Sequence, residues 1–380
     1  MKIVKRHYME GDENSINKLY KLITDRDRNI DQYKWEWVDT WNGQGSIWLA
    51  FDEHRENEDQ LIMQYSLIPT PLSVYGESFL AGKTENCMSH TEIRGKGLYF
   101  KHEQEFFEED KKRFHIFFTT TGNVANGAPG KVRLKLGYRA FDSWATLFFL
   151  TDKKAVYNFD RSNLNAKTRN LIAHFLNFLL PIYFWVFVPK QFSTEMTIVS
   201  EDYAPLKDID RLWERNKEFY GVTVERTFSY LDWRINKNPY FRHKYLIYKE
   251  DGVLNGYIIF YKYRETTVKV ADIFAEKKNS KILKKLIKQL LVWARKNKTE
   301  KVVFTTSASN KELKRVFYTC GFLSFMNIRK VTRLKKKENL SQKRPFHVFI
   351  SEPVLRRHPS ASKACNWYMT ELVFEGRKNY

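Results

Sequence analysis

The chain has 380 residues, of which 43% are hydrophobic and 16% aromatic, with 16 Gly and 10 Pro. This composition excludes a disordered or fibrous protein and is typical of a globular chain with two or three domains. The 65 basic and 44 acidic residues leave a net charge of +21. Such a charge favours anionic partners, namely nucleic acid, a membrane surface or phosphorylated small molecules, without choosing among them.

The three cysteines, Cys87, Cys320 and Cys365, lie far apart and form no CxxC pair. Their spacing argues against a disulfide framework or a zinc ribbon and fits a reducing compartment. The N-terminal residues lack the apolar core of a signal peptide. We therefore expect a cytoplasmic protein.

The first third of the chain is predicted to alternate strands and helices. Apolar residues at helical spacing after Asp12 indicate a helix, and β-branched and aromatic runs indicate strands. In chain order we expect a strand at 2–6, a helix from residue 12, an aromatic segment at 33–41, strands at 46–52, 61–69 and 84–90, a helix at 98–112 and a strand at 114–121.

Residues 211–325 follow the same order of elements. We expect a helix at 211–220, an aromatic segment at 230–240, a hairpin at 245–263, a strand at 268–275, a helix at 281–296 and a strand at 301–310. The string FFTTTGN at 117–123 precedes KLGY at 135–138, as VFTTSASN at 303–310 precedes TCGF at 319–322. Two copies of one fold explain this match most economically. The alternative is chance similarity between two short strand–loop segments.

An apolar run, residues 171–189, separates the two copies. It is near the length of a membrane span, but His174, Asn177 and Pro181 interrupt it. We expect a buried helix that ends near Pro181, followed by a buried strand at 182–188. Membrane-surface contact and a true span are the alternatives.

The sequence at 86–99, NCMSHTEIRGKGLY, is predicted to run from a strand through Arg94-Gly95-Lys96-Gly97 into a helix. Glycine at both positions lets backbone N–H groups turn toward one point. Those donors and the positive end of the helix form a site for phosphate oxygens, and the two basic residues add charge. This arrangement suits a pyrophosphate rather than a metal. The alternative is a basic turn that caps a helix.

The order strand, loop, helix, strand resembles the GNAT (GCN5-related) N-acetyltransferase family. The family's pyrophosphate motif is Arg/Gln-x-x-Gly-x-Gly/Ala, and Arg94, Gly97 and Tyr99 occupy its places. Tyr99 departs from the usual small residue, and Thr91 stands where many members have Pro. The resemblance is closest to bacterial members linked with surface-polysaccharide and amino-sugar modification. It covers residues 1–145 well and 195–325 weakly.

This resemblance implies tandem GNAT-like folds of the α/β (α+β) class, each a mixed, mostly antiparallel sheet flanked by helices. It implies acetyl-CoA as co-substrate, with its pantetheine paired to a strand that splays from its neighbour and its pyrophosphate on the loop. Asn123 contacts the cofactor in many members. The implied cofactor-binding residues are Cys87, Met88, Ser89, Arg94, Gly95, Lys96, Gly97, Leu98, Tyr99 and Asn123.

An amine that attacks a thioester must lose a proton, so a base is required. Glu85 is our first candidate and His90 our second, and strand alternation predicts that they lie on opposite faces. The alternative for each is an ordinary surface charge or a satisfied polar group. Many family members place a Tyr acid where this chain has Arg133 and Phe317. The proton donor to the thiolate is therefore unassigned, with Tyr138 and Tyr318 near these places but off register.

The second copy has EKKNS at 276–280 where the first has the glycine loop. Because glycines are absent, we expect backbone donors not to converge there, and we interpret this copy as degenerate and as shaping the acceptor pocket. Its helix carries a stripe of four lysines, which is either a solvated face or a surface for an anionic substrate: Lys281, Lys284, Lys285 and Lys288.

The predicted domains are 1–150 with the acetyl-CoA loop, a connector at 151–194, the degenerate copy at 195–335, and an extension at 336–380 that packs on the second copy. The leading hypothesis is acetyl-CoA-dependent N-acyl transfer to a primary amine of an amino sugar or nucleotide-linked sugar. The alternatives are a FemAB-like aminoacyl transferase and a non-enzymatic protein that binds nucleic acid or a membrane surface. For partners we expect a small amine acceptor, anionic or neutral, without a metal; nucleic acid ranks below it, and peripheral membrane contact stays open.

Overall fold

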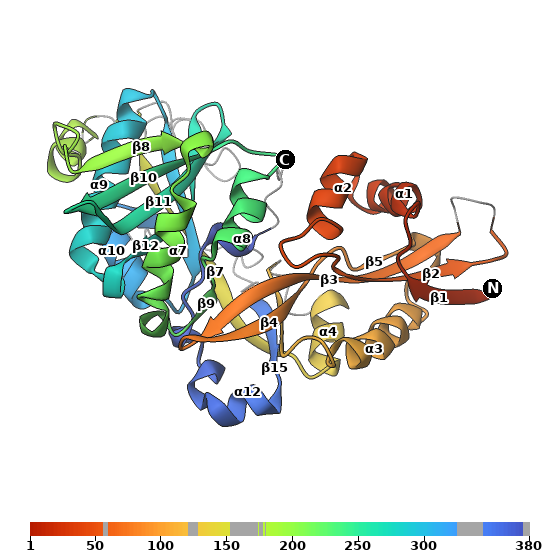
Figure 1. The fold of residues 1–380 in the computed structure, drawn as a ribbon. Coiled ribbons are helices and arrows are strands. Elements are labelled where there is room, and N and C mark those ends of the chain that lie inside the picture. The colour runs from red at the N-terminus through yellow and green to blue at the C-terminus, as the bar shows by residue number, and fades with distance from the viewer. Residues whose placement is uncertain are drawn as a thin grey trace. The chain divides into compact units, whose positions relative to one another are not determined.

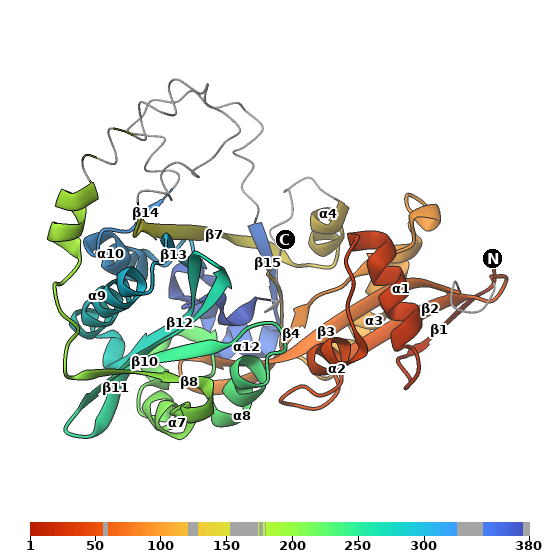
Figure 2. The same ribbon diagram turned by 90° about the horizontal axis from the view of Figure 1, so that it is seen from above.

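The computed structural model describes residues 1–55, 60–120, 128–152, 174, 178, 180–324 and 345–374. The chain divides into two compact units (Figures 1 and 2). Unit 1 comprises Met1–Ser143 and Gln342–Ala364, and unit 2 comprises Trp144–Ser341 and Cys365–Tyr380. In each unit, helices flank a mixed and mostly antiparallel sheet, as the sequence predicts.

The sheet of unit 1 contains one parallel pair among its described strands, β4 beside β6. Its order is β1 (Ile3–His7), β2 (Ser46–Asp52), β3 (Leu61–Val74), β4 (Glu77–Thr84), β6 (Ile116–Thr119), β15 (Pro345–Ile350) and the first part of β7 (Arg139–Leu150), and β5 (Met88–Ser89) also pairs with β3. The helices are α1 (Glu13–Thr24), α2 (Ile30–Trp37), α3 (Leu98–Asp110), α4 (Ala128–Lys135) and α12 (Glu352–Arg357). Aromatic residues of α3 and β6, together with Tyr138 just before β7, form a core cluster with Tyr65 and Leu67 of β3.

The sheet of unit 2 also has one parallel pair among its described strands, β12 beside β13. Its order is the second part of β7, β13 (Lys301–Ser307), β12 (Thr267–Ala275), β11 (Val253–Arg264), β10 (His243–Glu250) and β8 (Met196–Ser200), with β14 (Leu323–Ser324) on β7 and β9 (Val222–Val224) beside Trp367. The helices are α7 (Leu206–Glu214), α8 (Phe228–Leu231), α9 (Ser280–Lys296) and α10 (Lys311–Thr319).

Several predicted elements are confirmed within a residue or two. The predicted strand at 46–52 is β2, and the predicted helix at 281–296 begins one residue earlier as α9. The predicted hairpin at 245–263 consists of β10 and β11, joined by Asp251 and Gly252, which have left-handed φ of 50° and 77°. Two consecutive left-handed residues are what a tight two-residue hairpin requires.

Three predictions are wrong. The strand predicted at 182–188 is instead helical over 180–187, because successive turns of a helix place Tyr183 against Phe149 and Phe187 against Gly321. The single strand predicted at 84–90 is broken, because Asn86 takes a left-handed φ of 47°. The C-terminal extension does not pack as one piece on the second copy, because β15 hydrogen-bonds with β6 and β7 of unit 1.

Candidate functional site

The strands β4 and β6 of unit 1 pair in parallel over a short stretch, and we call the point where this pairing ends the fork. They pair in parallel from Ala81 beside Ile116 to Thr84 beside Thr119, where the pairing among the described residues ends. Beyond this point the chain follows β3 instead, because the N–H groups of Glu85 and His90 donate to carbonyls of β3. Residues 85–90 therefore turn one backbone edge away from β3 and toward the fork.

The loop Arg94–Gly97 follows this segment and leads directly into α3. Gly95 and Gly97 have left-handed φ of 79° and 73°, and Gly97 is the N-cap of α3, without a side-chain cap. No described residue accepts a hydrogen bond from the N–H groups of Gly95, Lys96 or Gly97, and the first N–H groups of any helix lack partners within it. A Cβ atom added at either glycine would meet nothing within 4 Å. The loop thus presents free backbone donors to open space.

Two cations border those donors. Arg94 and Lys96 are both exposed, and the Arg94 Nε donates to the Ser89 carbonyl at 3.4 Å. Positive charge, free N–H groups and a helix N-terminus are the features that bind phosphate oxygens. The residues present therefore fit the pyrophosphate of a coenzyme A molecule.

A buried polar cluster lies behind the segment 85–89. Arg133 of α4 forms an ion pair with Glu103 of α3, and the two side chains are 6% and 0% exposed. The Arg133 Nη2 also donates to the Cys87 Sγ at 3.2 Å. Burial opposes the charge of Arg133, but the neighbouring Cys87 and tyrosine hydroxyls keep its pKa above the ordinary value. The sequence placed Arg133 only as a substitute for an expected tyrosine, so its pairing with Glu103 was missed.

Tyr138 reaches the point where the fork opens. Its hydroxyl lies 3.5 Å from the Oγ1 of Thr84, the last residue of β4. Burial raises the pKa of Tyr138 to about 12. The hydroxyl therefore stays protonated near neutral pH and can donate a proton at the fork.

The two candidate bases occupy different surroundings. The Glu85 carboxylate is buried against Lys83, with 2.5 Å between Oε2 and Nζ. The His90 Nδ1 accepts from the N–H of Glu92 at 3.4 Å, and its Nε2 lies 3.5 Å from Arg55. The prediction that they share one strand is wrong, because the left-handed Asn86 interrupts it, so strand alternation does not relate their faces. Asn123 lies outside the described residues.

Unit 2 has an equivalent fork, and another part of unit 2 fills it. β12 and β13 pair from Thr267 beside Lys301 to Val270 beside Phe304. Beyond this point the segment 367–373 makes hydrogen bonds to both strands. These join the Thr306 Oγ1 to the Met369 carbonyl at 2.7 Å, the Thr370 Oγ1 to the Asp272 Oδ1 at 2.8 Å, and the Tyr368 hydroxyl to the Ile273 carbonyl at 2.5 Å.

The loop before α9 uses its donors internally. Lys277 and Lys278 adopt left-handed φ of 45° and 53°, so this loop turns without glycine. The N–H of Lys277 donates to the Asn216 Oδ1 at 2.9 Å. The Asn279 Oδ1 caps α9 by accepting from the N–H groups of Lys281 and Ile282. These described donors are consequently not available to a phosphate.

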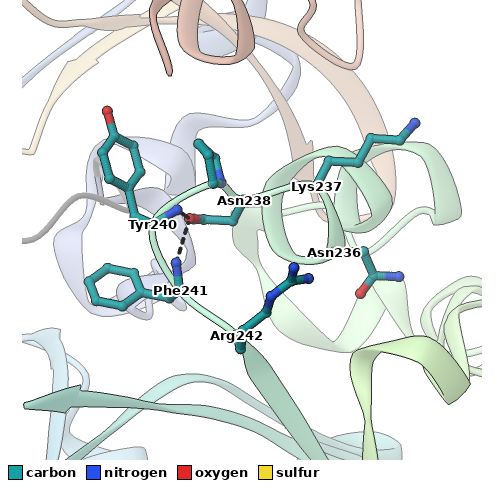
Figure 3. Close-up of a pocket in the computed structure, with 7 residues that line it drawn as sticks. Asn236, Lys237, Asn238, Tyr240, Phe241 and Arg242 are labelled. Carbon is teal, nitrogen blue, oxygen red and sulfur yellow. Dashed lines mark hydrogen bonds between the residues drawn. The ribbon is translucent and has the colours of Figure 1, made fainter. Parts of the chain in front are cut away.

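Two cavities of unit 2 involve none of the predicted site residues. One of about 410 Å³ lies along Asn236–Arg242, where the Asn238 Oδ1 accepts from the N–H groups of Tyr240 and Phe241 (Figure 3). Another of about 220 Å³ is lined by residues that include Trp144, Lys269 and Glu371. Within the described ranges, no group of three or more His, Cys, Asp or Glu side chains could hold a metal ion. Among those residues, too, no helix has the length and apolar character to cross a membrane.

Residues 207–322 match the model of the acetyltransferase (GNAT) family. The match covers less than a third of the chain and falls on unit 2, the part where the sequence resemblance was the weaker one. No curated protein matches the chain at a significant level.

Solved structures share the fold at low sequence identity. A conserved protein of Enterococcus faecalis V583 is 12% identical with a TM-score of 0.58, over 92% of this chain and 73% of that chain. A tandem GNAT protein from the clavulanic acid biosynthesis pathway is 10% identical with a TM-score of 0.53, over 92% and 98%. N-myristoyltransferase of Saccharomyces cerevisiae, with bound myristoyl-CoA, is 12% identical with a TM-score of 0.53, over 92% and 79%.

The GNAT match and the shared fold together define the class of protein. The chain is an acyltransferase with a GNAT domain at 207–322. Acetyl-CoA is the acyl donor of that family, and the loop at 94–97 has the chemistry to hold it.

Proposed function

We propose that the protein transfers an acetyl group from acetyl-CoA to the primary amine of an amino sugar or nucleotide-linked sugar, and that acetyl-CoA binds in unit 1. The observation that carries the proposal is the uncapped N-terminus of α3 behind Gly95 and Gly97. The equivalent donors of unit 2 are used by Asn216 and Asn279. We also propose that the two units are tandem copies, the second one without a cofactor, and that the protein is cytoplasmic.

Different residues of unit 1 bind different parts of acetyl-CoA. The N–H groups of the loop and of Leu98 and Tyr99, with Arg94 and Lys96, hold the pyrophosphate. The backbone of Cys87–Ser89 pairs with the pantetheine along the edge that faces away from β3, and Asn123 remains a proposed contact. Bound acetyl-CoA supplies a thioester at the fork. Donors fixed near its carbonyl stabilise the negative charge that develops there.

Proton transfer is assigned to side chains around the fork. Tyr138 holds a proton on its hydroxyl beside Thr84 and donates it to the departing thiolate. His90 is half-buried and Glu85 is buried against Lys83. Each stays a proposed acceptor for the proton of the attacking amine. His90 is now the better one, because the Glu85 carboxylate is held in a buried ion pair with Lys83 whereas His90 is only half-buried beside Arg55.

Acetyl-CoA binding tests the proposal directly. The measurement is thermal unfolding and calorimetric titration with acetyl-CoA for the native chain, Gly97→Glu and the matched control Lys278→Glu. At a ligand concentration 100-fold above Kd, acetyl-CoA should stabilise the native chain by about 2.7 kcal/mol. Gly97→Glu should abolish this because a carboxylate repels the phosphates, while Lys278→Glu should retain it with one site per chain.

Two results would contradict the proposal. If no acyl-CoA stabilises the native chain, the loop is a basic helix cap. If Lys278→Glu loses binding while Gly97→Glu keeps it, the cofactor binds in unit 2.

Transfer to amines tests the acceptor and the acid. Release of the CoA thiol should be faster with glucosamine or UDP-glucosamine than with ethanolamine if amino sugars are the acceptors. Tyr138→Phe should lower kcat by about 100-fold and leave acetyl-CoA affinity unchanged, as expected for loss of a general acid. Tyr65→Phe, which removes a buried hydroxyl of the same core cluster, is the control. Equal rates in both variants would remove Tyr138 from the mechanism.

A further inference from the structure

Phe178 and residues 180–187 have apolar side chains on two faces, one packed against the rest of unit 2 and one in solvent. Residues 180–187 form a short helix, drawn in light green beside α9 and α10 in Figure 2. On its inner face the Tyr183 ring stacks on Phe149, with 4.7 Å between centroids. Phe187 packs so closely on Gly321 that a Cβ there would lie 2.6 Å from its ring. The inner contacts fix which face points outward.

Large apolar side chains form that outer face. Phe178 is 74%, Ile182 55%, Trp185 77% and Val186 53% exposed. At about 100° per residue these positions lie within about 100° of one another around the helix axis. Most other exposed apolar side chains among the described residues are scattered singly. A contiguous apolar stripe on a soluble surface marks an interaction site.

Basic residues of α9 border this stripe. The guanidinium carbon of Arg295 lies 5.3 Å from the Phe184 ring centroid. The Lys284 carbonyl accepts from the Cys320 Sγ at 4.0 Å, and Cys320 precedes the glycine on which Phe187 packs. Lys284, Lys288 and Arg295 lie within about 40° of one another around α9. Arg295 therefore lies at the flank of helix 180–187, and Lys284 and Lys288 share its face of α9.

We propose that this surface, Phe178 and residues 180–187 with Lys284, Lys288 and Arg295, docks on an anionic lipid bilayer. Tryptophan, phenylalanine and isoleucine on a helix face enter the boundary between headgroups and acyl chains, and nearby Lys and Arg pair with lipid phosphates. The net charge of +21 adds long-range attraction to the same partner. A nucleic acid would use the cations but would leave the apolar stripe uncovered.

Vesicle sedimentation tests the proposal with the full chain and without acetyl-CoA. The native chain should pellet with phosphatidylcholine–phosphatidylglycerol vesicles and stay in the supernatant with phosphatidylcholine alone. The double variant Ile182→Ser/Trp185→Ser should lose at least about tenfold in affinity for the mixed vesicles. Lys284→Gln/Lys288→Gln should lose affinity and show a weaker salt dependence.

Matched controls separate this surface from general effects. Tyr203→Ser removes an aromatic side chain that is 79% exposed elsewhere in unit 2. Lys207→Gln/Lys244→Gln removes two exposed cations away from α9. Both controls should bind the mixed vesicles like the native chain, and all variants should unfold at the native temperature.

Three outcomes would overturn the proposal. The first is a native chain that does not bind mixed vesicles. The second is equal vesicle binding by the native chain and Ile182→Ser/Trp185→Ser. The third is a dimer in sedimentation velocity that the same substitutions dissociate, which would show that a second copy covers the stripe.

Discussion

The loops that precede α3 and α9 each contain two left-handed residues, but they differ in whether their backbone N–H groups have acceptors. Gly95 and Gly97 are left-handed in the first loop, and Lys277 and Lys278 are left-handed in the second. The first loop leaves its N–H groups free, whereas the second gives described donors to Asn216 and Asn279. Loop shape alone therefore does not identify a phosphate site. The presence or absence of an internal acceptor decides whether the donors are available.

The forks show the same contrast. In unit 2 the C-terminal segment 367–373 hydrogen-bonds across the opening between β12 and β13. In unit 1 the described side chains at the opening are Tyr138, beside Thr84, and Arg133, beside Cys87. The fork of unit 2 is therefore closed by internal hydrogen bonds. The fork of unit 1 instead has ionisable and proton-donating side chains beside it. The GNAT family match falls on the unit whose fork is filled, so the match reports fold more directly than cofactor occupancy.

The largest expected effect is the loss of Asp272 in β12. Its carboxylate pairs with Arg226 through two contacts of 3.1 Å and also accepts from Tyr257 and Thr370. Asp272→Ala leaves the buried guanidinium without its counter-charge and should lower the free energy of unfolding by about 3–5 kcal/mol. Urea denaturation followed by circular dichroism measures this loss.

The exposed pair Lys285–Glu195 provides the control for this measurement. Both side chains are about half exposed, so Glu195→Ala should change stability by less than about 1 kcal/mol. Limited proteolysis of Asp272→Ala should also cut near residues 367–373 sooner than in the native chain. A stability loss as small as that of the control would show that the segment does not depend on Asp272.

A buried carboxylate of unit 1 is expected to have a smaller effect of opposite sign. Asp110, at the end of α3, accepts from the Ser46 hydroxyl at 2.7 Å, and burial raises its pKa to about 6. Since its pKa is ordinarily near 3.8, the folded state binds the proton more tightly. Stability from this group is therefore full below pH 4 and is lost as the pH rises to about 6.

Asp110→Asn should remove this cost while keeping the hydrogen bond to Ser46. We expect a gain of about 2–3 kcal/mol at pH 7, which shrinks toward zero near pH 4. Urea denaturation of both proteins across this pH range gives the difference, and the exposed Glu218→Gln is the control. A gain that does not change with pH would mean that packing rather than ionisation limits this site.

The sequence predicts most of the helices and strands, and it predicts that the glycine loop at 94–97 leads into a helix. Apolar periodicity is enough to place α9, because one face of this helix packs against a core. β2 is placed instead by its run of apolar residues, most of which are buried. Apolar periodicity misplaces 182–188, because a short run that is apolar on every side fits a helix and a strand equally well. It also misses the Arg133–Glu103 pair, since these residues lie on different helices and meet only in the folded unit.

The C-terminal part shows another limit of sequence reasoning. The strand β15 lies within the extension predicted at 336–380, but it pairs with strands far away in the sequence. The His347 N–H, for example, donates to the Thr119 Oγ1, 228 residues before it. Local patterns carry no information on such pairing. Local patterns likewise do not predict the hydrogen bond between Thr370 and Asp272, which attaches the C-terminal segment at the fork of unit 2.

The smallest expected effect concerns the cap that distinguishes the two loops. Asn279→Ala removes the acceptor for the N–H groups of Lys281 and Ile282 and should lower stability by about 1 kcal/mol, the usual cost of losing an Asn cap. If the cap alone kept phosphate away, this variant would bind a second acetyl-CoA. We expect one site per chain to remain, because Asn216 still holds the N–H of Lys277 and residues 367–373 still fill the fork. Calorimetric titration of the variant decides between these outcomes, and a second site would show that one side chain separates the two loops.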